Sequence, residues 1–158
     1  MERIGYKCFN KDMTNRYGNK FKVGHTYSVS GEIKFGNSGN GFHFCTNFED
    51  CFRYFSTFDE EISLCLVKGY GNISCYNDEY YGFYDMFCSS NIEIIKELSR
   101  EEIIQMALRL NEIRICRFIQ LFKLNNDEKN MILEKFKKNK NVLFYMNYYQ
   151  DNKVLKKI

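Results

Sequence analysis

The sequence predicts an α+β protein, in which a small, twisted, mostly antiparallel sheet with one crossover helix precedes a helical C-terminal subdomain. Three observations lead to this prediction. Side chains alternate with a period of two in several runs before residue 98, apolar residues recur at helical spacing after it, and a helix-start motif lies between. We therefore expect a β-rich domain over residues 1–98 and a basic helical subdomain over residues 99–158.

Two early runs predict the first strands. Residues 4–9 and residues 21–29 alternate between apolar or aromatic and polar side chains, which is typical of a strand with one buried face. In the second run, Phe21 and Val23 should point inward, and Gly24 indicates a bulge or a tight bend. The segment 31–41 contains several glycines and predicts an irregular connection rather than an element.

The segment from Gly39 to Gly71 is expected to form the centre of the domain. Phe42–Phe44 predicts a short strand, and residues 62–67 predict a second, mostly buried strand. Thr46 or Asn47 can begin a helix between them, with carboxylates in its first turn. We expect the two strands to lie side by side, bridged by this helix. Its predicted apolar face consists of Phe48, Cys51, Phe52 and Phe55.

Residues 91–98 predict the last strand, and helices should follow it. Ser99 with Glu102 forms the capping-box pattern that marks a helix start. Asn111 predicts a break between two helices, Asn125 predicts a further helix start, and residues 142–149 fit either a helix or a strand. On the third helix, the side chains expected to point inward are Met131, Ile132, Leu133 and Phe136.

Charge divides the chain unevenly, with a net charge of −3 over residues 1–98 and +6 over residues 99–158. This asymmetry leads us to expect a non-enzymatic interaction protein of viral or mobile-element type that binds a protein or another macromolecular partner. An RNA-binding protein is an alternative, because lysines and aromatic rings can hold single-stranded nucleic acid. The candidate residues are Lys135, Lys137, Lys138, Tyr145 and Tyr148.

Composition indicates the compartment. The seven cysteines are scattered, no secretory leader pattern is seen, and no window of about 20 apolar residues could span a membrane. We therefore expect a soluble intracellular protein of the cytoplasm, its own or that of a host cell, with its oligomeric state left open. The cysteine spacings do not match a structural zinc site, so no metal is expected, although His43 and Cys45 share a strand face.

A family resemblance gives the enzymatic alternative. Phe35-Gly36, Gly41–Cys45, the aromatic helix ending at Tyr54 and Leu64–Gly69 resemble the central segment of poly(ADP-ribose)-polymerase-like ADP-ribosyltransferases. The resemblance implies NAD as the ligand, a cofactor that the interaction-protein hypothesis does not require. The chain departs from the family on the first strand, where Tyr6-Lys7-Cys8 replaces a His-Gly-Thr motif.

The same resemblance implies roles for three residues. His43 stands where the family has the tyrosine that stacks on nicotinamide, and Tyr54 would close the pocket. Asp78-Glu79-Tyr80 is similar to the family's catalytic motif, which makes Glu79 the candidate catalytic residue that orients the ribose 2′-hydroxyl. A degenerate module that binds NAD without catalysis is the other form of this alternative.

A broader resemblance covers about the first 100 residues. The runs Tyr6–Phe9, Val23–Tyr27, Gly41–Cys45 and Ile92–Leu98 look like those of a family of small uncharacterised phage, bacterial and giant-virus proteins. This resemblance implies no established activity.

Overall fold

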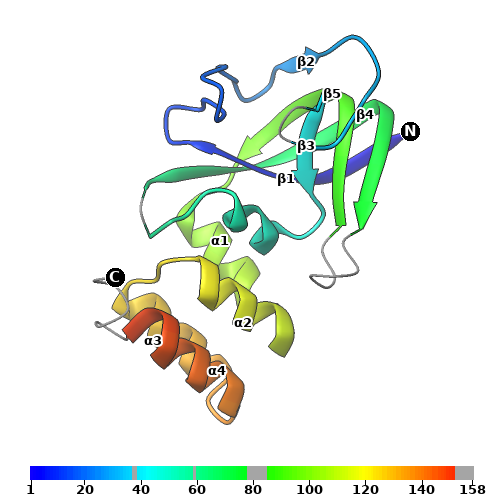
Figure 1. Cartoon of the computed structure of the whole chain (residues 1–158). Helices are drawn as coiled ribbons and strands as arrows, with labels where there is room; N and C mark the ends of the chain where they lie inside the picture. The colour runs from blue at the N-terminus through cyan, green and yellow to red at the C-terminus, as the bar shows by residue number, and fades with distance from the viewer. Residues whose placement is uncertain (37–38, 59, 78–84, 152–158) are drawn as a thin grey trace. The chain divides into compact units, whose positions relative to one another are not determined.

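A computed structural model describes residues 1–36, 39–58, 60–77 and 85–151 (Figure 1). The chain divides into two compact units. The sheet unit comprises residues 1–55 and 61–98, and the helical unit comprises residues 56–60 and 99–158. Strands before helices in the order of the chain confirm the predicted α+β class.

The sheet unit contains five strands and one short helix. The elements are β1 (Glu2–Asn10), β2 (Thr26–Ser28), β3 (Phe42–Cys45), the 3₁₀-helix η1 (Phe48–Arg53), β4 (Ile62–Asn77) and β5 (Asp85–Glu97). Every paired strand is antiparallel to its neighbour. Figure 1 shows β4 and β5 as long strands that run side by side.

The pairings form a ring of four strands. β4 pairs with β1 along one edge and with β5 along the other, and β5 also pairs with β3 and β2. β1 and β3 close the ring at the single pair Tyr6 and Cys45. The prediction that β3 lies beside β4 is therefore wrong, because β1 and β5 occupy the two edges of β4.

Phe44 fills the inside of this ring. Its ring lies so close to two glycines that a Cβ atom at Gly5 would lie 2.7 Å from it and one at Gly69 would lie 2.3 Å from it. Phe44 is 2% exposed, and Phe52 and Leu64 are equally buried, as expected of the predicted centre. The inward residues that surround Phe44 form one apolar cluster: Phe9, Phe21, Cys65, Val67, Phe87, Ile92 and Ile94.

The predicted strand over residues 21–29 is shorter than expected. Gly24 adopts a positive φ of 83°, which glycine accommodates without strain, and the chain turns there before β2 begins at Thr26. Phe21 is buried as predicted, but Val23 is 45% exposed and the prediction that it points inward is wrong. The bend predicted at Gly24 is therefore present, and it shortens the strand to the residues after it.

The predicted crossover helix is present as a short 3₁₀-helix. η1 begins after Asn47, whose side chain makes no capping hydrogen bond, and the predicted apolar face is buried. Glu49 and Asp50 lie in its first turn as predicted, and both are fully buried. The Asp50 carboxylate lies 3.8 Å from the Arg53 guanidinium, so η1 contributes charge as well as apolar surface to the interior.

Three helices of the helical unit begin where the sequence predicts. Its elements are α1 (Arg100–Ala107), α2 (Glu112–Leu121), α3 (Asn126–Lys135), α4 (Lys140–Tyr145) and the π-helix η2 (Met146–Asp151). Ser99 and Asn125 form complete capping boxes, and Asn111 caps α2. The ambiguous segment 142–149 is helical.

Inward positions in α3 are only partly as predicted. Ile132 is fully buried, whereas Met131 is 41% exposed, so its predicted inward orientation is wrong. A window of adjacent apolar residues cannot all face one side of a helix, because successive residues are about 100° apart. Among the described residues, no helix is long and apolar enough to cross a membrane.

Candidate functional site

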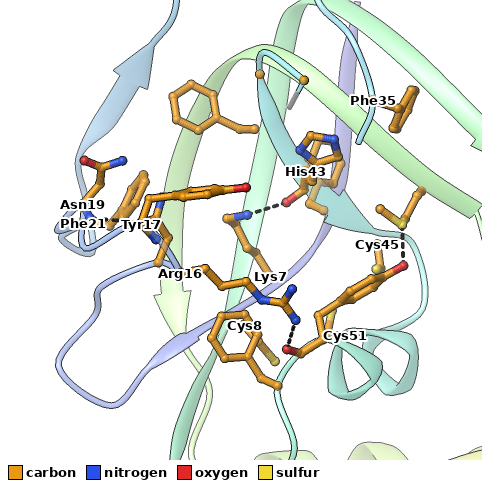
Figure 2. Close-up of a pocket in the computed structure, with 18 of the residues that line it drawn as sticks. Lys7, Cys8, Arg16, Tyr17, Asn19, Phe21, Phe35, His43, Cys45 and Cys51 are labelled. Atoms are coloured by element: carbon orange, nitrogen blue, oxygen red, sulfur yellow. Dashed lines mark hydrogen bonds between the residues drawn. The ribbon is translucent and has the colours of Figure 1, made fainter. Parts of the chain in front are cut away.

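A cavity of about 720 Å³ opens in the sheet unit beside β1 and β3 (Figure 2). Aromatic rings, cysteines and amide side chains line it, together with the two cationic residues Lys7 and Arg16. None of the described residues that line it is an aspartate or a glutamate. The cavity wall is therefore aromatic and positively charged.

The cavity exists because β1 and β3 meet only at one pair of residues, Tyr6 and Cys45. Lys7 follows Tyr6 and points to the inner face of β1, the face that Gly5 and Phe9 share. Its amine donates a hydrogen bond of 2.7 Å to the backbone carbonyl oxygen of His43. Figure 2 shows this side chain directed from β1 toward β3, so that Lys7 spans the gap between the strands.

Buried thiols lie in or beside the cavity wall: Cys45 and Cys51 line it, and Cys88 lies next to His43. Hydrogen bonding with Cys51, together with burial, raises the pKa of Cys45 well above its usual value, and burial likewise raises the pKa of Cys51. Burial raises the pKa of Cys88 to about 11. Thiols are nucleophilic and bind metals as thiolates, so these cysteines are poorly reactive. Within the described residues, no group of three or more His, Cys, Asp or Glu side chains is arranged to hold a metal ion.

His43 presents a neutral ring to the cavity. Burial, and next the charge of Lys7, lower the pKa of His43. The Gly36 N–H donates to its Nε2 at 3.4 Å, and the Cys88 sulfur lies 4.0 Å from its Nδ1. The ring of Phe35 packs edge-on against it with 5.5 Å between centroids. These contacts fix the orientation of a half-buried planar ring.

Arg16 lies at the opposite side of the cavity, on the segment after β1. Its guanidinium donates to the backbone carbonyl oxygen of Tyr54 and lies 5.9 Å from the ring centre of Tyr54 and 5.6 Å from that of Phe55. The hydroxyl of Tyr54 donates to the sulfur of Met86 at 2.9 Å. Arg16 is exposed, so its remaining N–H groups can reach a ligand.

The structure brings two of the predicted site residues together. His43 and Tyr54 line the same cavity, and Figure 2 shows His43 next to Lys7. Glu79, the candidate catalytic residue, lies outside the described residues. The structure therefore brings together the two predicted ligand-binding residues, and their roles stay predictions.

The candidate nucleic-acid residues belong to the helical unit. Lys135, Lys137, Lys138 and Tyr148 are exposed, and Tyr145 is half-buried. The three lysines border a shallow hollow of about 400 Å³ together with Phe136 and Asn139. Tyr148 stacks on the exposed ring of Phe144, with 5.7 Å between centroids.

Sequence reasoning missed Lys7 and Arg16 as site residues. A signal for Lys7 was present, because its position in β1 has the same parity as the buried residues Gly5 and Phe9. A lysine on the buried face of a strand is rare unless it is paired, which marks it as a candidate. No comparable signal exists for Arg16, since only the folded path of residues 10–21 brings it to the cavity.

Comparison with known proteins gives one family match. The family model described as "Domain of unknown function (DUF7666)" matches residues 3–106. This range contains all the described residues that line the cavity. No curated protein and no solved structure matches the chain.

Proposed function

We propose that this chain, which belongs to the family of the domain of unknown function DUF7666, uses its sheet unit to bind a planar, anionic ligand of the NAD type. The observation that carries the proposal is the composition of the cavity wall. It combines two cationic side chains with several aromatic rings and, among the described residues, no carboxylate.

Charge favours an anionic ligand. A phosphate that enters the cavity would meet Arg16 without repulsion from a carboxylate in the described lining. The guanidinium of Arg16 uses one N–H for the carbonyl oxygen of Tyr54, and its planar fork has further donors for phosphate oxygens. This supports a diphosphate bridge bound near the exposed end of Arg16.

Shape and aromatic surface favour a planar ring. The cavity volume of about 720 Å³ falls within the range of roughly 300 to 1,000 Å³ that small-molecule sites occupy. Aromatic faces prefer to stack in offset or edge-on geometry, and the fixed ring of His43 offers such a face. We assign the nicotinamide or adenine ring of the ligand to His43.

The ADP-ribosyltransferase resemblance supports the same assignment. It places His43 at the nicotinamide and Tyr54 at the pocket edge, and both residues line this cavity. The enzymatic form of the proposal adds Glu79 as the group that orients the ribose 2′-hydroxyl. A Glu79→Gln variant that retains NAD binding but loses NAD hydrolysis would support the enzyme, and absence of hydrolysis by the wild-type chain would leave the binding module.

Calorimetric titration tests the binding proposal. NAD should bind the wild-type chain, and Arg16→Gln should weaken binding at least about tenfold, because a charged hydrogen bond to phosphate contributes roughly 1.5 to 3 kcal/mol. His43→Ala should weaken the binding of NAD and leave the binding of inorganic pyrophosphate unchanged.

Lys137→Gln in the exposed surface of the helical unit is the control for these titrations and should bind NAD like the wild type. The proposal fails if the wild-type chain binds neither NAD nor AMP at millimolar concentration. It also fails if the control weakens binding as much as Arg16→Gln does.

A second candidate function concerns the helical unit, namely binding of a macromolecular partner. The supporting observation is the stacked pair Phe144 and Tyr148, which are 60% and 43% exposed on a lysine-rich unit. Exposed rings beside lysines suit single-stranded RNA, whose binding weakens steeply with salt. Anisotropy of a labelled RNA at two salt concentrations tests this version, and equal or absent binding at both would exclude it.

A further inference from the structure

The amine of Lys7 occupies an unusual position for a lysine. It lies in the cavity wall on the inner face of β1, donates to the carbonyl oxygen of His43 at 2.7 Å and lies 5.7 Å from the ring centre of Phe9. Lys68 and Lys11, by contrast, are paired with the carboxylates of Glu93 and Glu61. Lys7 is instead held by a neutral carbonyl oxygen.

The titratable and charged groups that face Lys7 come from each neighbouring element. They are Cys8 from β1, His43 and Cys45 from β3, Cys51 from η1, Cys88 from β5 and Arg16 from the segment after β1. None of these groups is a carboxylate. Within the described residues, therefore, the ammonium form of Lys7 has no counter-ion, and burial lowers the pKa of its amine.

A neutral lysine amine is a nucleophile, because its lone pair is then available. In the neutral form Lys7 keeps two hydrogens, and the hydrogen bond to His43 uses one of them. This bond holds the nitrogen in the cavity wall while its lone pair remains available for reaction. The poorly reactive thiols around it would not compete for an electrophile.

We propose that Lys7 is a nucleophilic amine that forms an imine with an aldehyde or ketone whose ring and anionic group fit the same cavity. The amine nitrogen attacks the carbonyl carbon and forms the C–N bond. The two amine hydrogens pass to the carbonyl oxygen, which leaves as water, and the C=N bond remains. The aromatic wall would hold the ring of the compound and Arg16 would hold its anionic group.

Reductive trapping of the full-length wild-type chain tests this proposal. The chain is treated briefly at neutral pH with pyridoxal 5′-phosphate, or with pyridoxal, which has the same ring without the phosphate. Borohydride then fixes each imine, and peptide mass spectrometry measures the modified fraction of every lysine. We expect Lys7 to be modified faster than Lys68 and Lys11, because a lowered pKa leaves a larger fraction of its amine neutral and nucleophilic.

Lys68 and Lys11 are internal controls, since both are paired with carboxylates that raise their pKa values. Modification of Lys7 no faster than that of these two residues would overturn the proposal. Arg16→Gln should slow labelling of Lys7 by pyridoxal 5′-phosphate and leave labelling by pyridoxal unchanged. Equal effects on both reagents would contradict the assigned role of Arg16. NAD is absent from this experiment, so the imine proposal and the proposed function can fail separately.

Discussion

The sheet unit and the helical unit use their polar side chains in opposite ways. In the helical unit, Arg100 donates two hydrogen bonds of 2.7 Å to the carboxylate of Glu128, so a buried acid and its partner neutralise each other. In the sheet unit, Lys7 and Arg16 each donate to a backbone carbonyl oxygen beside a cavity. The helical unit thus uses these groups for its fold, whereas under the proposed function Lys7 and Arg16 of the sheet unit keep positive charge available for a ligand.

The largest effect is expected at Gln150, whose amide satisfies three backbone groups in the helical unit. It donates to the carbonyl oxygens of Ile119 and Phe122 and accepts from the N–H of Leu124. Gln150→Leu should lower the free energy of unfolding of this unit by about 3 kcal/mol, because each buried unsatisfied group costs roughly 1 to 3 kcal/mol. Amide hydrogen exchange, measured separately for the two units, gives this loss of stability. A loss confined to the sheet unit would contradict the structural role assigned to Gln150.

Gly69→Ala should have the next largest effect, in the sheet unit. The new methyl group would overlap the ring of Phe44, and overpacking of this kind costs about 1 to 3 kcal/mol. Denaturant unfolding measures the change. Adding Phe44→Leu to the same chain should recover part of the loss, since it removes the atoms that clash. If the double variant instead loses more unfolding free energy than the two single variants do together, this packing is contradicted.

Ser99→Ala tests the predicted start of α1. It removes the acceptor for the Glu102 N–H and should lower the free energy of unfolding of the helical unit by about 1 kcal/mol. Gln105→Ala, an exposed change in the middle of the same helix, is the control and should have little effect. Equal losses in the two variants would show that the capping box does not stabilise α1.

The smallest effect is a pH dependence at Lys7. Burial lowers its pKa in the folded state below the ordinary value of 10.5, so the unfolded chain binds more protons between these two pKa values. The contribution of Lys7 to stability should therefore rise as pH increases toward 10.5. The difference in unfolding free energy between the wild type and Lys7→Met measures it across that range. A difference that falls with pH would mean that the amine is charged and well paired.

The two units also differ in how far the sequence predicts them. Helix starts at Ser99, Asn111 and Asn125 were predicted because a capping side chain acts on residues two or three positions away. The order of strands in the sheet was not predicted, because the pairing of β1 with β4 depends on residues far apart in the chain. Local patterns therefore identified the elements but not the ring of strands.

The site shows the same limit. His43 and Tyr54 were found through short motifs within one segment, and both line the cavity. Lys7 and Arg16 come from elsewhere in the chain: the meeting of β1 with β3 brings Lys7 to His43, and the folded path of residues 10–21 brings Arg16 to the same cavity. Residues assembled from distant segments leave little trace in a single sequence, although strand parity could have singled out Lys7.

Amide chemical-shift mapping during a titration with NAD tests the central claim most directly, since it reports on both units in one experiment. If the cavity of the sheet unit is the ligand site, the largest shifts should come from residues 7, 16, 43 and 54, and residues 135–148 should stay unchanged. Shifts confined to residues 135–148, or none at all at millimolar NAD, would contradict it.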